Sequence, residues 1–124
     1  MSDYSPENLS VLSLKEIEGI DTELGDKTGE WFLNNYKSER IPLELRHRSQ
    51  ECAERIFSFL RAHRSNGSAT TPEAVDVHPK FQLVIQQYND FVVIKGPDLA
   101  VYKRLLIESV LIRQEFAKLI VENS

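Results

Sequence analysis

The C-terminal segment constrains the fold most, because it carries more apolar side chains than one face of a helix requires. Six positions at spacings of three and four residues form a heptad seam: Tyr102, Leu105, Ser109, Ile112, Phe116 and Leu119. A second apolar stripe runs beside it: Leu99, Leu106, Val110, Ala117 and Val121. A surface helix usually buries an apolar arc of about 100°, and the two stripes together cover roughly half the circumference. The segment 98–122 is therefore predicted to be a helix that is central in its domain or shared with another chain.

The segment that follows Ile41-Pro42 shows the same helical period. Its apolar positions fall on one face at about 100° per residue: Leu45, Ser49, Cys52, Ile56, Phe59, Leu60 and His63. Pro42 suits the first turn of a helix, where a missing N–H removes no hydrogen bond. We predict a long helix over 43–63, with Cys52 buried and the ring of His63 at the edge of the core.

The N-terminal third shows a clear helix start and several helix-weakening residues. Ser13-Leu-Lys-Glu16 has the pattern of a capping box, in which each side chain accepts a hydrogen bond from the other residue's backbone. Three glycines follow, and each costs about 1 kcal/mol relative to alanine inside a helix. We therefore expect a helix over 14–24, a break near Gly25, and a second helix over 27–38.

Residues 79–95 fit two structures. Their apolar positions follow a helical period, which favours a helix. The same stretch holds two β-favouring runs on either side of Tyr88-Asn-Asp90, a sequence suited to a hairpin turn. We predict a helix and keep a hairpin at 82–95 as the alternative. Gly96-Pro97-Asp98 then reads as the end of one element and the N-cap of the last helix.

Length and composition indicate a globular protein. The chain has 124 residues, of which 41% are hydrophobic and 27% charged, and its longest apolar runs are too short to span a bilayer. We predict an all-α fold, a small four-helix-type bundle with a short extra N-terminal helix, in a single domain over 11–124. Residues 1–10 are predicted to be disordered. The alternative class is α+β, with the hairpin at 82–95.

No catalytic constellation stands out in the sequence. Glu44-Leu-Arg-His47 is half of a di-iron pattern, but a second copy of that pattern is absent from the sequence. Cys52 is the only cysteine, so no internal disulfide can form. We predict a protein that is not an enzyme, with no catalytic residues, no cofactor and no metal ion. The polar, acidic start lacks the features of a targeting signal, which makes the cytoplasm the expected location.

Charge is distributed unevenly along the chain. Residues 1–30 hold eight acids and two lysines, whereas residues 40–64 hold six arginines and three glutamates. We expect the acidic part to fold against this basic helix, in the same chain or in a neighbouring one, and the alternative is a charged docking surface. Five arginines offer contacts for DNA or RNA: Arg46, Arg48, Arg55, Arg61 and Arg64. Because acids interrupt this set and the pI is about 5.4, a regulator associated with DNA or RNA is the alternative function and not the first.

Two further surfaces complete the prediction. Trp31 and Tyr36 could line a groove for a partner or a ligand, and a small-molecule-binding bundle is the second alternative. The wide apolar arc of 98–122 supports a partner interface made by four residues: Ile107, Leu111, Tyr102 and Phe116. The first hypothesis is a non-enzymatic protein-interaction module, a cytoplasmic regulator or adaptor that acts as a homodimer. Its partner is another protein, including a second copy of itself, and not a membrane.

Overall fold

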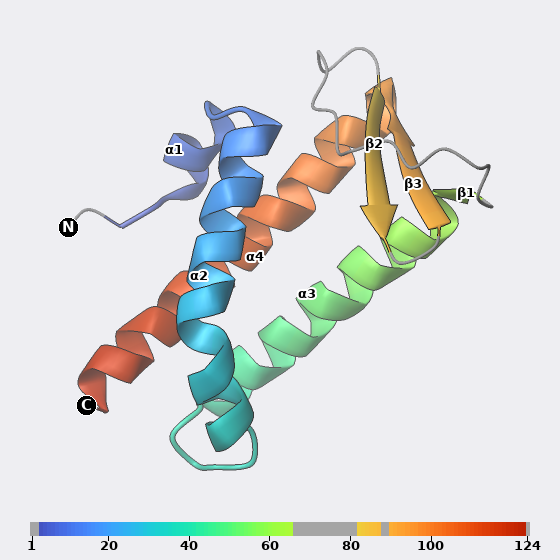
Figure 1. Cartoon of the computed structure of the whole chain (residues 1–124). Helices are drawn as coiled ribbons and strands as arrows, with labels where there is room; N and C mark the ends of the chain where they lie inside the picture. Colours follow the sequence, from blue (N-terminus) through green and yellow to red (C-terminus); the bar gives the residue numbers. More distant parts are fainter. Residues whose placement is uncertain (1–2, 66–81, 88–89, 124) are drawn as a thin grey trace. The chain divides into compact units, whose positions relative to one another are not determined.

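The computed structural model describes residues 3–65, 82–87 and 90–123. Within these residues the chain forms four helices: α1 (Pro6–Ser10), α2 (Leu14–Asn35), α3 (Leu43–Ala62) and α4 (Gly96–Glu122) (Figure 1). Three strands lie between α3 and α4 in the same described part of the chain: β1 (Arg64–Ser65), β2 (Gln82–Gln87) and β3 (Asp90–Lys95). The fold is mostly helical, as predicted.

The chain divides into two compact units. Unit 1 consists of Met1–Ala53 together with Leu106–Ser124, and unit 2 consists of Glu54–Leu105. Both α3 and α4 contribute residues to each unit. For this reason, the single domain predicted over 11–124 stays a prediction.

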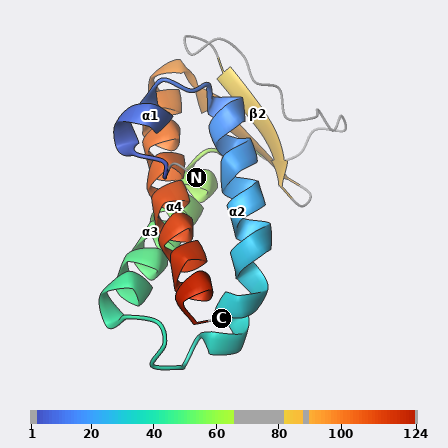
Figure 2. The same ribbon diagram turned by 90° about the vertical axis from the view of Figure 1, so that its left-hand side faces the viewer.

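Residues 3–10 of unit 1 include helix α1, and the disorder predicted over 1–10 stays a prediction. Ser5 caps α1 by accepting a hydrogen bond from the Asn8 amide, and Leu9 is fully buried. Ahead of α1, the amide of Tyr4 donates to Oε1 of Gln114 over 2.7 Å, and Nε2 of Gln114 donates back to the Tyr4 carbonyl over 3.0 Å. Figure 2 shows the chain ahead of α2 beside α4. The capping residue and the contacts with α4 together compensate for the short length of α1.

Helix α2 starts at the predicted capping box. Oγ of Ser13 accepts from the Glu16 amide over 3.1 Å, and Oε1 of Glu16 accepts from the Ser13 amide over 3.2 Å. The break expected near Gly25 is wrong, because α2 runs without interruption from Leu14 to Asn35. Tertiary contacts with α4, described below, outweigh the weak helix propensity of its glycines.

Helices α3 and α4 confirm the helical periods read from the sequence. In α3, Leu45 and Cys52 are buried. Six large apolar side chains of α4 are buried: Leu99, Tyr102, Leu106, Val110, Ile112 and Phe116. Most of the wide apolar arc of this helix is therefore covered by the chain itself. The helix begins at Gly96, so Asp98 lies in its first turn and is not the N-cap.

Unit 2 contains an antiparallel sheet in the order β1-β3-β2. β2 and β3 pair from Gln82 opposite Lys95 to Gln87 opposite Asp90, and β1 pairs with β3 through Arg64 opposite Val92. The helix predicted over 79–95 is therefore wrong where the structure describes it, and the hairpin alternative is correct.

Burial explains why the strand pattern prevails. Val92 and Ile94, two residues apart on β3, are both buried, so one face of the strand is covered. The segments 79–81 and 88–89, which belong to the stretch predicted as a helix, lie outside the described residues. In the described part of the chain, no helix is long and apolar enough to cross a membrane.

Candidate functional site

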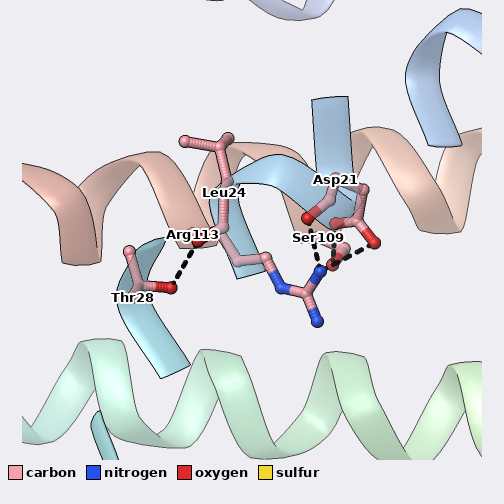
Figure 3. Close-up of polar contacts among 5 residues, drawn as sticks. All are labelled: Asp21, Leu24, Thr28, Ser109 and Arg113. Carbon is pink, nitrogen blue, oxygen red and sulfur yellow. Dashed lines mark hydrogen bonds and ion pairs between the residues drawn. The ribbon is translucent and has the colours of Figure 1, made fainter. Parts of the chain in front are cut away.

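A partly buried polar cluster joins α2 to α4 in unit 1 (Figure 3). Oγ of Ser109 donates a hydrogen bond to Oδ1 of Asp21 over 2.6 Å, and Nη1 of Arg113 lies 2.9 Å from Oδ2 of the same carboxylate. Nη1 also donates to the backbone carbonyl of Asp21 over 2.6 Å. The carboxylate is thus held by a hydroxyl and a guanidinium. We call Asp21, Ser109 and Arg113 the Asp21 cluster, and its geometry is that of a tether between two helices.

Gly25 provides the space that the Asp21 cluster requires. A β-carbon built at Gly25 would lie 2.8 Å from Nη1 and 3.0 Å from Cζ of Arg113, which is closer than side-chain atoms normally approach. Gly19 and Gly29 on the same helix have no such neighbour within 4 Å. The glycine that looked like a helix break therefore allows the guanidinium to lie against α2.

Two acids of the N-terminal part pair with α4. Asp3 lies 2.7 Å from Nζ of Lys118, and Asp21 pairs with Arg113, so both acids contact α4. The pairing of the acidic part as a whole with the basic helix stays a prediction.

The five predicted nucleic-acid contacts are divided between the units. Arg48 forms a two-point ion pair with Glu115, at 2.8 and 3.1 Å, and this hydrogen-bonded contact raises the pKa of Arg48. Nη2 of Arg46 donates to the Ser38 carbonyl over 2.8 Å. The other three arginines are exposed and belong to unit 2: Arg55, Arg61 and Arg64. The set therefore does not form a single patch within one unit.

Aromatic rings extend from the core of unit 1 to its surface at the end of α2. Phe32 packs edge-on against Phe116 at 5.2 Å between centroids and against Tyr36 at 5.4 Å. Of the two predicted groove residues, Trp31 is half-buried and Tyr36 is 46% exposed. Arg46 lies over the Tyr36 ring, with Cζ 5.8 Å from the centroid. The Tyr36 ring thus contacts the Phe32 ring and also the guanidinium of Arg46, in a cation–π arrangement.

Two exposed leucines lie close in the sequence to Tyr36 or to Arg46. Leu33 is 76% exposed, and it lies one turn before Tyr36 on α2. Leu43 is 67% exposed, and it lies one turn before Arg46, the residue that covers Tyr36. We call Leu33, Tyr36 and Leu43 the connection surface, because they flank the connection between α2 and α3. The sequence analysis missed the two leucines, although both fall outside the apolar stripes and next to a helix end.

The predicted interface residues of α4 have unequal positions. Tyr102 and Phe116 are buried and contact rings of their own chain, Phe59 at 5.7 Å and Phe32 at 5.2 Å. Ile107 and Leu111 are half-buried. The last two therefore retain some surface for a partner, whereas the two aromatic residues serve the core.

A pocket of about 340 Å³ lies in unit 1 between the start of α3 and the end of α4. Leu45 and Leu119 supply apolar walls, and the Arg48–Glu115 ion pair lies at its edge. Neither Trp31 nor Tyr36 lines this pocket. The predicted ligand groove and the pocket are therefore separate features.

His63 occupies the edge of the core in unit 2, as expected. Its Nδ1 is 2.8 Å from the Phe59 carbonyl, and its Nε2 is 3.1 Å from Oδ2 of Asp98. The hydrogen bond to Phe59 raises the pKa of His63 above its ordinary 6.5, Asp98 adds to this rise, and partial burial opposes it. Glu44 and His47, the half-motif for a metal, are exposed on α3. Across residues 3–65, 82–87 and 90–123, no group of three or more metal-binding side chains occurs.

Comparisons with protein-family models, with curated proteins and with solved structures gave no match to this chain. The function is therefore argued from the surfaces described above.

Proposed function

We propose that the protein is a non-enzymatic interaction module, a regulator or adaptor that associates with a second copy of itself through the connection surface. The observation that carries the proposal is the exposure of Leu33, Tyr36 and Leu43. Single exposed apolar residues are common on soluble proteins, whereas a contiguous exposed apolar patch is typical of a binding site. Tyrosine adds to this argument, because it is enriched among the residues that dominate binding energy.

The charges around the connection surface favour a second copy as the occupant. Lys37 and Arg40 are exposed beside it, and so are Glu39 and Glu44. In a two-fold symmetric contact, the same patch meets itself, so a patch that is complementary to itself needs both signs of charge. Two copies related by such an axis can place the cations of one opposite the acids of the other, around an apolar centre.

The half-buried pair Ile107 and Leu111 is the second candidate contact. This pair is part of the interface predicted from the wide apolar arc of α4. Different substitutions are expected to disrupt a contact at this pair and a contact at the connection surface. Binding of DNA or RNA and binding of a small molecule are the alternative functions. Arg46 and Arg48 already contact groups of their own chain, which weighs against nucleic-acid binding. The pocket at the end of α4 favours small-molecule binding.

Sedimentation equilibrium over a range of protein concentrations tests the proposal. The wild type is expected to approach twice the monomer mass at high concentration. Leu33→Glu combined with Leu43→Glu should shift the association to higher concentration by more than tenfold, because each introduced charge would be desolvated at the contact. Val11→Glu is the matched control, since Val11 is 82% exposed and lies outside the connection surface.

Each outcome decides a separate point. A wild type that remains monomeric at every concentration contradicts self-association. A dimer that survives the double substitution but is lost on changing Ile107 or Leu111 moves the contact to α4. Circular dichroism of each variant must match the wild type, so that loss of mass reflects loss of contact and not unfolding.

A further inference from the structure

We propose that His63 and Asp98 form a pH-sensitive clasp in unit 2, closed when the imidazole is protonated and weakened when it loses its proton. Three elements meet at this residue. His63 directly follows α3, its carbonyl accepts from the Val93 amide of β3 over 3.1 Å, and its ring reaches Asp98 in the first turn of α4. The clasp therefore holds the end of α3, the strand β3 and the start of α4 together.

Both ring nitrogens of His63 can donate a hydrogen bond only when the imidazole is protonated. Both ring nitrogens face oxygen atoms that can only accept: the carbonyl of Phe59 at 2.8 Å and the carboxylate of Asp98 at 3.1 Å. A neutral imidazole carries one N–H and one lone pair, so it can donate to only one of them. Loss of the proton therefore costs one hydrogen bond and turns one lone pair toward an oxygen atom.

The surroundings of the ring also favour its cation. His63 lies at the C-terminal end of α3, where the helix dipole stabilises positive charge. Phe59 stacks on the ring at 4.2 Å, and Tyr102 stacks on the other side of Phe59 at 5.7 Å. These contacts fix the plane of the imidazole, so the ring cannot turn freely to find water when it becomes neutral.

The charged groups around His63 can be named by element. Asp98 is the acid that faces the ring from α4, and Tyr102 lies beyond Phe59. β3 meets His63 through the backbone of Val93, and its Lys95 is exposed. Arg61 and Arg64 flank His63 in the sequence and are exposed cations. The carboxylate of Asp98 is thus the group whose removal should change the titration of the ring most.

Two NMR measurements on the full chain test the clasp. In a pH titration, His63 is expected to titrate above its ordinary 6.5. Asp98→Asn should lower the midpoint of His63, because it removes the acid that faces the ring. Hydrogen exchange then reports opening: after correction for base catalysis, protection of the Val93 amide should fall severalfold as pH rises through the His63 midpoint.

Variants separate a clasp from a passive core residue. In His63→Gln the pH-dependent part of the Val93 protection should disappear, while His47→Gln, on the exposed face of α3, should retain it. If His63→Gln fails to fold, Asp98→Asn gives the same comparison with the imidazole intact. A His63 midpoint at or below 6.5, or Val93 protection with the same pH dependence in the wild type and the variant, would overturn the proposal.

Discussion

Gly25 offers the sharpest test of how unit 1 is held together. Exchange of a helical glycine for alanine stabilises a helix by about 1 kcal/mol when the new methyl group meets no other atom. Gly29→Ala meets that condition, because nothing lies within 4 Å of its β-carbon position. Gly25→Ala brings the same gain in propensity but places its β-carbon 2.8 Å from Nη1 of Arg113.

The magnitude follows from the contacts that Arg113 would lose. Its guanidinium must shift, and because Nη1 is held by the carbonyl and the carboxylate of Asp21 at 2.6 and 2.9 Å, the shift weakens both contacts. A hydrogen bond to a charged group contributes about 1.5–3 kcal/mol. Because the Arg113 side chain is 38% exposed, the lower part of that range applies. Gly25→Ala should therefore be less stable than Gly29→Ala by about 2 kcal/mol.

Urea unfolding followed by circular dichroism measures this difference. For a protein of this size, about 2 kcal/mol separates the two midpoints by roughly 1 M urea. In an Arg113→Ala background the obstruction is gone, so Gly25→Ala should then stabilise the protein by about 1 kcal/mol. The reasoning is refuted if Gly25→Ala is as stable as Gly29→Ala in the otherwise wild-type chain.

Three other outcomes are expected. Cys52 is 3% exposed, so a thiol reagent should modify the native protein far more slowly than the unfolded one, and rapid native labelling would show that the site is open. The raised pKa of His63 stabilises the fold fully below about pH 6.5, and this contribution is lost as pH rises through the folded-state pKa. The urea midpoint of the wild type should therefore fall toward that of His63→Gln as pH rises above about 6.5, and parallel midpoints would contradict the linkage. Changing half-buried Ile107 and Leu111 together to Glu should lower the free energy of unfolding by about 2 kcal/mol or more. A folded monomer of wild-type stability would instead place both residues at an interface.

Local patterns were sufficient for the elements that depend on one segment alone. The period of 43–63 and of 98–122 predicts both long helices, and Ser13 with Glu16 predicts where α2 begins. These features arise from contacts within a few residues of each other. They can therefore be read from the sequence without knowledge of the tertiary structure.

The errors fall where a distant residue decides the outcome. Gly25 reads as a break until Arg113, far along the chain, is seen to occupy the space beside it. Residues 82–95 satisfy a helical and a strand period, and pairing of β3 with both β1 and β2 selects the strand. Tyr102 and Phe116, predicted at a partner interface, are buried against Phe59 and Phe32, and their part in an interface stays a prediction.

The candidate site was predicted only in part. Tyr36 was identified by its residue type, whereas Leu33 and Leu43 look like ordinary helix residues in the sequence. Their exposure depends on how α2 ends and α3 begins. The connection between those helices is positioned by the hydrogen bond from Arg46 to the Ser38 carbonyl, which no local pattern indicates.

Hydrogen–deuterium exchange at low and high protein concentration tests the central claim most directly, because it detects and locates self-association in one measurement. Peptides that cover residues 33–46 are predicted to exchange more slowly at high concentration, with Val11→Glu behaving as the wild type and Leu33→Glu with Leu43→Glu losing the effect. Exchange that does not depend on concentration anywhere in the chain, or protection confined to residues 107–111, would contradict the proposal that the connection surface is the contact between two copies.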